Sequence, residues 1–199
     1  MSSNRSERMG SRGGLAGIID SLRYHEASRQ GLGLILLLVC AWFTLPAGEN
    51  RIAAGFVIAA LGQAWRIYAA GVIYKNKRLA TTGAYSLVRH PLYFGNFLIL
   101  AGFTLACANW TVVAAVAFFL LFYYPAAIRY EDRKLQDLFG SEWQAWGTQT
   151  PAMFPIRLQW RSNQEAEWNL RQSMLRNGEL VYTLFELAAA VLLWYRATL

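Results

Sequence analysis

Cysteine is scarce in this sequence, which has two in 199 residues, Cys40 and Cys107. Cys40 lies inside an apolar run and Cys107 lies near the end of another, and neither has the spacing of a metal-binding motif. Both cysteines are therefore expected to pack as small hydrophobic residues, and no metal site is predicted.

Acidic residues are also few, because 12 Asp and Glu oppose 19 Lys and Arg, for a net charge of +7. A basic chain can bind nucleic acid, but the sequence holds no basic-aromatic recognition module of that kind. The basic residues lie instead between apolar runs, where they suit anionic lipid headgroups. The charge pattern predicts membrane lipids and no nucleic acid as partners, and it leaves the oligomeric state open.

The sequence further lacks an apolar signal core near its start, an internal repeat and a second soluble domain. Residues 1–12 are polar and rich in Gly, Ser and Arg, so a cleaved signal peptide is not expected. The predicted organisation is a polar N-terminal segment over 1–30, a membrane core over 31–156, and an interfacial helix with one further span over 157–199.

Hydrophobic residues, by contrast, make up 55% of the chain. A helix that crosses a bilayer needs about 20 mostly apolar residues. Stretches of about this length predict spans over 31–47, 52–74, 91–108, 111–128 and 179–195. The predicted fold class is therefore an all-α membrane protein with about five transmembrane helices.

Local signals predict how the chain continues after the fourth span. Pro125 is expected to kink that span or open its last turn, and Gly140 indicates a helix stop. Residues 162–176 are expected to form a polar helix on the surface. The aromatic residues expected in an interfacial layer are Trp143, Trp146, Phe154 and Trp160.

The distribution of basic residues predicts the orientation. Five Lys and Arg precede the first span, four lie in 75–90 and seven in 129–176, whereas Arg51 and Arg196 fall on the other side. Basic residues are enriched in cytosolic segments of membrane proteins. The N-terminus and both polar segments are therefore predicted to face the cytosol.

The polar segment before the third span carries one set of candidate functional residues. Arg89 and His90 stand directly before Pro91, which favours the first turn of a helix, and the exposed N–H groups of such a turn attract anions. Tyr85 and Tyr93 add aromatic faces suited to a purine or a sulfonium cation. On composition alone, a belt of basic and aromatic residues that anchors a span is the simpler interpretation.

A second set follows the fourth span, where Glu131 and Asp132 lie between Arg129 and Arg133. A carboxylate here could bind an ammonium group, while Arg129 could orient an anionic acceptor. A solvated helix with charge pairs is the common alternative. Neither segment decides the function by its residue types alone.

Together the two segments resemble the isoprenylcysteine carboxyl methyltransferase family, which belongs with the phospholipid methyltransferases among integral membrane enzymes. The resemblance covers about residues 52–155, and two motifs match in order with membrane spans between them. The first motif comprises Gly83, Tyr85, Arg89, His90, Pro91, Tyr93 and Gly95. The second comprises Arg129, Glu131, Asp132, Leu135, Phe139, Gly140 and Trp143. Asp132 departs from the family's usual Glu-Glu pair.

The resemblance implies methyl transfer from S-adenosylmethionine, with a cytosolic-face cofactor pocket formed by the C-terminal half of the core. It implies a lipid, prenylated or other lipid-attached acceptor that enters between helices near Arg129. Arg129 and His90 are the candidate catalytic residues, and an amine or phenol acceptor would need a base. The residues implied to contact the cofactor are Lys77, Arg78, Leu79, Ala80, Tyr85, His90, Pro91, Leu92, Tyr93 and Glu131.

Two charged residues lie deep inside predicted spans, Arg66 in the second and Glu186 in the fifth. Charges at such depth are costly, and they are usually paired or functional. We expect both side chains to face the bundle interior at similar depth, where they can meet. The alternative is that each extends separately toward the interface.

Two further classes of protein compete with the methyltransferase interpretation. Sterol reductases are similar in an Arg-His-Pro-type segment but use NADPH, and they are longer with more spans. A non-catalytic lipid-binding scaffold would not require two ordered motifs on one membrane face. The compact chain and its paired motifs therefore favour the methyltransferase.

Overall fold

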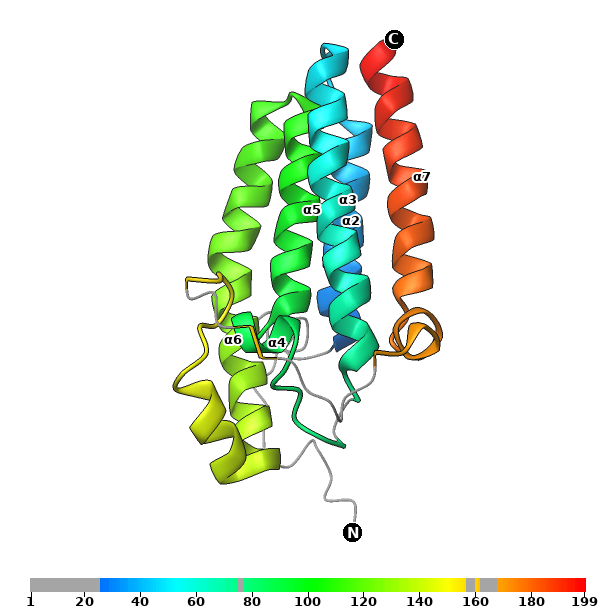
Figure 1. Ribbon diagram of the computed structural model, residues 1–199. Coiled ribbons are helices and arrows are strands. Elements are labelled where there is room, and N and C mark those ends of the chain that lie inside the picture. The colour runs from blue at the N-terminus through cyan, green and yellow to red at the C-terminus, as the bar shows by residue number, and fades with distance from the viewer. Residues whose placement is uncertain (1–25, 75–76, 157–159, 162–167) are drawn as a thin grey trace.

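The described part of the chain is helical throughout its regular structure; the computed structural model describes residues 26–74, 77–156, 160–161 and 168–199. Within it five long helices stand side by side (Figure 1): α2 (Glu26–Trp42), α3 (Glu49–Val72), α5 (Pro91–Cys107), α6 (Trp110–Gly147) and α7 (Glu179–Thr198). A four-residue helix, α4 (Ala84–Leu87), and a π-helical turn, η1 (Gln172–Arg176), lie near one end of the bundle. The all-α prediction is confirmed, and most of the segment predicted over 1–30 lies outside the described residues.

The outer surface of the bundle suits a membrane. Among the described residues three helices, α3, α6 and α7, are long and apolar enough to cross a bilayer, whereas α5 and the apolar part of α2, Gly31–Trp42, are shorter. Large apolar side chains face outward, and Leu121 is 71% and Val191 67% exposed. A surface of this kind fits lipid better than water. The chain is thus an integral membrane protein, and the number of five crossings stays a prediction.

Small residues let α3 and α5 pack closely. A Cβ atom added at Gly55 would lie 2.5 Å from the carbonyl oxygen of Gly102, and one at Gly62 would lie 2.7 Å from that of Gly95. Glycine at such positions lets two helix backbones approach in a way that a side chain would prevent. This packing brings the last two turns of α3 against the first turns of α5, where the motif residues stand.

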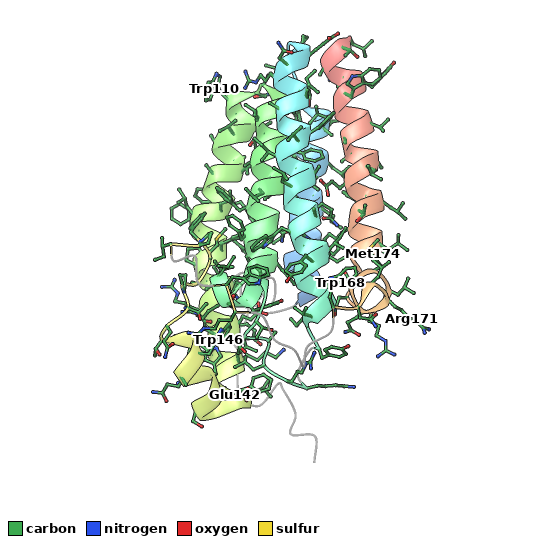
Figure 2. All side chains as sticks on the ribbon, in the orientation of Figure 1. Trp110, Glu142, Trp146, Trp168, Arg171 and Met174 are labelled. Carbon is green, nitrogen blue, oxygen red and sulfur yellow. The ribbon has the colours of Figure 1, made fainter. Side chains whose placement is uncertain are left out.

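The two polar segments singled out in the sequence lie at the same end of the bundle. Helix α3 ends there and α5 begins there, and the charged last part of α6 reaches past the other helices (Figure 1). Figure 2 shows Glu142, Trp146 and Arg171 at this end and Trp110 at the other. We call it the polar end, made of residues 77–90, 129–156 and 168–178.

Helix α6 continues through Pro125, and its residue with non-helical backbone angles is Gly140, at φ 51° and ψ −120°. Two helical stretches meet there at a kink, so the helix interruption predicted at Gly140 is found, since a positive φ is easy for glycine. Trp146, expected in an interfacial layer, is buried instead, because its Nε1 donates to the carbonyl oxygen of Tyr85 at 3.1 Å.

The segment before α7 agrees in part with the polar surface helix predicted over 162–176, of which 162–167 lie outside the described residues. Residues 170–176 are helical and end in the turn η1, with Arg171 and Arg176 exposed and Gln172 and Ser173 buried. Their side chains donate to the carbonyl oxygens of Ile73 and Ile67, at 3.0 and 2.8 Å. The carbonyl of Ile73 lies past the end of α3 and has no helical partner, whereas that of Ile67 lies inside the helix. The C-terminal segment thus docks on the last turns of α3 through these two hydrogen bonds.

Candidate active site

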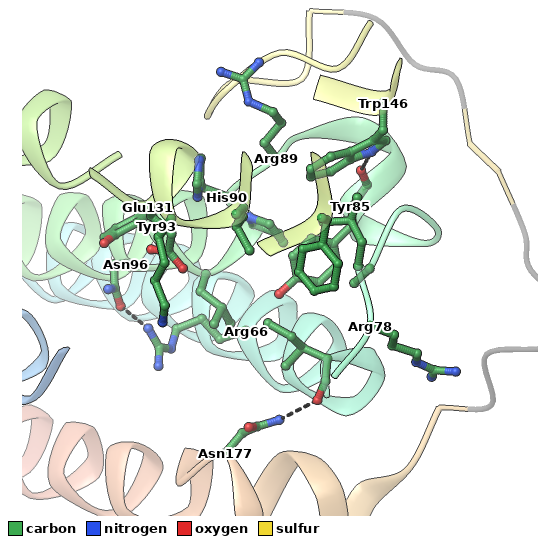
Figure 3. Close-up of a pocket in the computed structure, with 18 of the residues that line it drawn as sticks. Arg66, Arg78, Tyr85, Arg89, His90, Tyr93, Asn96, Glu131, Trp146 and Asn177 are labelled. Atoms are coloured by element: carbon green, nitrogen blue, oxygen red, sulfur yellow. Dashed lines mark hydrogen bonds between the residues drawn. The ribbon is translucent and has the colours of Figure 1, made fainter. Parts of the chain in front are cut away.

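A cavity opens at the polar end, between the end of α3, the α4–α5 turn, α6 and the start of α7 (Figure 3). Most residues that the resemblance assigns to the cofactor line it. They are Arg78, Leu79, Ala80, Tyr85, His90, Pro91, Leu92, Tyr93 and Glu131. The structure therefore brings together residues from two segments that are about forty positions apart in the chain.

Two predicted site residues do not line this cavity. Lys77 is exposed beside it, and Arg129 is exposed on α6 one turn before Arg133. An arginine that orients an acceptor must reach the reacting groups. The position of Arg129 gives no support to the catalytic part that the resemblance assigned to it.

The first wall of the cavity is the turn that carries α4. Gly83 has φ +59°, and the hydroxyl of Tyr68 would lie 2.8 Å from any Cβ at this position, so the turn requires glycine. Ser86 closes the turn, since its Oγ donates to the carbonyl oxygen of Gly83 at 2.7 Å. This geometry buries Tyr85 against Trp146, and burial, with the nearby charge of Glu131, raises the pKa of the Tyr85 hydroxyl. Tyr85 therefore stays neutral at physiological pH.

The second wall is α6 beyond its apolar part, and Asp132 fastens it to the motif. Arg89 donates to both carboxylate oxygens of Asp132, at 2.9 and 3.2 Å, and His90 Nε2 lies 2.9 Å from Oδ1. Burial of the Asp132 carboxyl opposes its ionisation, but the hydrogen bonds from His90 and Arg89 outweigh burial and lower its pKa. The two adjacent acidic residues therefore have different positions. Glu131 faces the cavity, whereas Asp132 binds Arg89 and His90 and so connects the two walls.

Residues after α6 complete the attachment. Arg89 Nη1 donates to the carbonyl oxygens of Gly147 and Thr150, at 2.8 and 2.7 Å. The backbone N–H groups of Arg89 and His90 donate to Pro151 and Ala152, at 2.8 and 3.0 Å. The Arg-His pair is therefore embedded in protein on the side away from the cavity, and His90 is buried.

The floor of the cavity is a buried ion pair. Arg66 Nη2 and Nε donate to the two carboxylate oxygens of Glu179, at 2.7 and 3.1 Å, and Nη1 donates to Asn96 Oδ1. Figure 3 shows Arg66 and Asn96 joined in this way, beside Tyr93 and Glu131. Because Arg66 and Glu179 are 4% and 1% exposed, each neutralises a charge that would otherwise be costly to bury.

This floor confirms one part of the prediction for the intramembrane charges and corrects another. Arg66 and Glu186 both face the interior, at 4% and 9% exposure. The carboxylate that pairs with Arg66 is however Glu179, two turns earlier on α7. Sequence reasoning placed Glu179 at the first position of the last span and so gave it no role. The sequence did show an acidic residue, Glu179, at the start of the last span, and such a side chain can point into the bundle.

Asn96 and Asn177 are further lining residues that the sequence did not indicate. Asn177 precedes α7, and its Nδ2 donates to the carbonyl oxygens of Ala70 and Ile73 at 2.7 and 3.2 Å. It therefore seals the end of α3 while bordering the cavity. Asparagine before a glycine is a common turn signal, which is why its contact with another helix could not be foreseen.

Metal binding finds no support in the arrangement of side chains. Across the described residues, no group of three or more His, Cys, Asp and Glu side chains is placed to hold a metal ion. Cys40 and Cys107 are both buried as free thiols in the apolar core.

Known proteins give an independent measure of relationship. The family model for phospholipid methyltransferases matches residues 29–142. The chain is 38% identical over 125 residues to the cobalt-zinc-cadmium resistance protein CzcN of Cupriavidus metallidurans, which covers 62% of this chain and 56% of that protein. It is 38% identical over 102 residues to the nickel-cobalt-cadmium resistance protein NccN of Alcaligenes xylosoxydans xylosoxydans, which covers 51% and 46%. The chain thus spans about half the length of these curated relatives, and no solved structure matches it.

Proposed function

We propose that this chain, which belongs to the phospholipid methyltransferase family, transfers a methyl group from S-adenosylmethionine to a lipid or lipid-attached acceptor at the cytosolic membrane face. The observation that carries the proposal is that both sequence motifs line one cavity at one end of the bundle. A scaffold protein would have no need of such convergence.

The side chains that line the cavity fit this cofactor. Tyr85 and Tyr93 offer aromatic faces to a purine and a sulfonium cation. Glu131 offers a carboxylate to the amino group of the methionine part, and Arg78 at the exposed rim offers a cation to its carboxylate. Leu79, Leu92, Leu135 and Phe139 supply apolar surface between these polar groups. The lining thus offers charged partners to the amino and carboxylate groups of the methionine part, and aromatic and apolar surface to the adenosine part.

The bound cofactor supplies an electrophilic methyl group, so the protein has mainly to align the acceptor and exclude water. Good alignment alone contributes on the order of 7–11 kcal/mol to such a reaction. The buried Arg66–Glu179 pair and the rigid Arg89–Asp132 attachment keep the floor and walls of the cavity in place. His90 Nε2 is hydrogen-bonded to Asp132, which fixes the orientation of the imidazole ring at the cavity wall.

The side of the membrane follows from charge. Residues 77–90 and 129–156 share one end of the bundle and hold six Lys and Arg residues: Lys77, Arg78, Arg89, Arg129, Arg133 and Lys134. Segments rich in Lys and Arg remain cytosolic during membrane insertion. The cavity is therefore assigned to the cytosolic side, where S-adenosylmethionine is made.

The names of the two relatives refer to resistance against metals. In a methyltransferase, such a link would run through a methylated membrane component, whose altered headgroup changes the charge of the surface. The acceptor, not a metal ion, would then be the molecule that connects the two functions.

Ligand-dependent stabilisation of the purified protein in detergent tests the proposal. S-adenosylmethionine and its demethylated product should raise the unfolding temperature, and at about 100 times the dissociation constant the gain is roughly 2.7 kcal/mol. NADPH should have no effect. Glu131→Ala should abolish the stabilisation, while Glu142→Ala, at an exposed position of the same helix, should keep it. Equal stabilisation of both variants would refute the placement of the site.

A further inference from the structure

The segment 168–178, which leads into α7, buries polar side chains and exposes apolar ones. Gln172 and Ser173 are 8% and 0% exposed, whereas Leu170 and Leu175 are 55% and 62% exposed. In water this arrangement would be unfavourable, because apolar area would stay solvated while polar groups are removed from solvent. The exposed side of the segment is therefore suited to an apolar phase.

The position of the segment in the bundle places this side at the edge of the membrane. The segment runs directly into α7, which is long and apolar enough to cross a bilayer, and η1 lies at the foot of that helix (Figure 1). The next exposed apolar side chains, Leu180, Val181 and Leu184, belong to the outer surface of α7. The exposed side of 168–178 thus continues the lipid-facing surface of α7 toward the headgroup region.

The same exposed side carries positive charge. Arg171 and Arg176 are exposed, and no Asp or Glu occurs in residues 168–178. Figure 2 shows Arg171 directed away from the bundle. A surface element that combines exposed arginines with exposed leucines and a tryptophan is typical of contacts with an anionic membrane surface, where the guanidinium groups meet phosphates and the apolar side chains enter the acyl boundary.

Trp168 and Asn169 fasten the start of the segment to the last turn of α3. A Cβ atom added at Gly71 would overlap the indole of Trp168, so the ring lies directly on the backbone of the helix. The backbone N–H of Asn169 donates to the carbonyl oxygen of Gly71 at 3.1 Å. With the hydrogen bonds of Gln172 and Ser173 to α3, these contacts attach the buried side of the segment to one helix end.

That helix end is also part of the wall of the cofactor cavity. Ile73 lines the cavity, and Arg78 and Leu79, which the resemblance assigns to the cofactor, follow a few residues later. Asn177 lines the same cavity from the segment itself. The segment 168–178 therefore connects a lipid-facing surface to the cofactor cavity through contacts with the end of α3.

We propose that the segment 168–178 binds the headgroups of anionic phospholipids through Arg171 and Arg176, with Leu170 and Leu175 in the acyl boundary, and that this contact holds the end of α3 where cofactor binding requires it. The inference rests on the proposed function and adds to it a dependence on the charge of the surrounding membrane. The contact lies outside the family-matched residues 29–142.

Quenching by spin-labelled lipid tests the lipid contact without any cofactor. A bimane label on Leu175→Cys is accessible, whereas Cys40 and Cys107 are buried. In phosphatidylcholine nanodiscs, spin-labelled phosphatidylglycerol should quench this label more strongly than spin-labelled phosphatidylcholine does. Each arginine near the surface contributes about fivefold to the affinity for anionic lipid, so Arg171→Gln with Arg176→Gln should remove most of the preference. Equal quenching by the two lipids without these substitutions would overturn the proposal.

Cofactor affinity tests the second part of the proposal. The ligand is the demethylated product of the cofactor, because it carries no net charge and an anionic surface does not concentrate it. The wild type should bind it several-fold more tightly in nanodiscs that contain phosphatidylglycerol than in phosphatidylcholine alone. Arg171→Gln with Arg176→Gln should bind it equally in both. Inorganic phosphate added to phosphatidylcholine nanodiscs should not replace the anionic lipid, and full replacement would overturn the lipid nature of the ligand.

A matched variant controls for the loss of charge. Arg133→Gln with Arg161→Gln removes the same charge from exposed positions that do not line the cavity, and it should keep the wild-type dependence on phosphatidylglycerol. The same dependence in the Arg171 and Arg176 variant would overturn the proposal. If that double variant does not fold, Arg171→Gln alone should lower the quenching preference by about fivefold.

The two measurements separate this proposal from the proposed function. Absence of cofactor binding in both kinds of nanodisc would overturn the proposed function and with it the cofactor part of the inference, while the quenching still decides whether anionic lipid gathers at Leu175. Cofactor binding with the same affinity in both kinds of nanodisc would leave the proposed function standing and overturn the dependence on membrane charge.

Discussion

The family-matched part of the chain and its C-terminal segment contribute to the same cavity in different ways. The matched part, residues 29–142, supplies the aromatic faces, Glu131 and the Arg89–Asp132 attachment. The C-terminal segment supplies Glu179, which neutralises Arg66 at the floor, and Asn177, which closes the end of α3. The comparison teaches that a helix outside the shared core can still be part of the site. Variants at the contacts between the two parts test how far they depend on each other.

Removal of Arg66 should have the largest effect. Arg66→Met leaves Glu179 buried and without its cation, and breaking a buried pair in this way costs about 3–5 kcal/mol. The double variant Arg66→Met with Glu179→Met should recover most of the loss. Unfolding in detergent followed by circular dichroism measures both, and an equally unstable double variant would show that the pair does not couple the two parts.

Crowding the α3–α5 contact should have the next largest effect. Gly55→Ala places a Cβ 2.5 Å from the carbonyl oxygen of Gly102, and such overpacking costs about 1–3 kcal/mol. Gly33→Ala on α2, where a Cβ meets nothing within 4 Å, is the matched control and should leave the unfolding temperature unchanged or raise it. Because alanine favours a helix more than glycine does, a similar loss in both variants would show that the close approach at Gly55 is not its cause.

Asp132 should make the free energy of unfolding depend on pH. Its pKa is lowered by folding, so its contribution is present above the ordinary pKa of about 3.9 and is lost as pH falls through the folded value. Asp132→Asn should cost about 1.5–3 kcal/mol at neutral pH, the range for hydrogen bonds to a charged group. The difference from wild type should shrink below about pH 4. A constant difference from pH 7 to pH 3 would contradict the charged attachment.

The contact of Asn177 with the end of α3 should have the smallest effect. Asn177→Ala removes two hydrogen bonds from a side chain that is partly exposed, and a typical net cost is about 1 kcal/mol. Cofactor affinity should fall little if the C-terminal segment stays docked through Ser173. Hydrogen exchange at residues 66–73 should nevertheless increase, and unchanged exchange would show that the cap has no part in closing α3.

Sequence patterns predicted the elements that depend on local chemistry. Apolar runs located the helices, Pro91 marked the start of α5, and two short motifs indicated a common cavity. They could not predict contacts that depend on how far helices are shifted along their axes. The partner of Arg66 was one such contact, because Glu179 and Glu186 share one face of α7 and the depth of that helix decides which of them meets Arg66. The interruption of α6 at Gly140, in contrast, was predicted from the residue type, since glycine adopts a positive φ easily.

Arg129 belongs to the second motif but does not line the cavity. The arginine precedes Glu131 by two residues, and on a helix two residues apart face different directions. Glu131 lines the cavity, so Arg129 faces outward and is exposed. Its orientation could have been derived from helical periodicity once Glu131 was assigned to the cavity.

The central claim is that the α4–α5 turn and the polar part of α6 close over one molecule of S-adenosylmethionine. Photolabelling with an azido derivative of the cofactor, mapped by mass spectrometry, tests this claim most directly. We predict label on peptides that cover residues 79–93 and on peptides that cover 130–139, with both displaced by unlabelled cofactor. Label confined to one of these segments, or placed at the opposite end of the bundle, would contradict the claim.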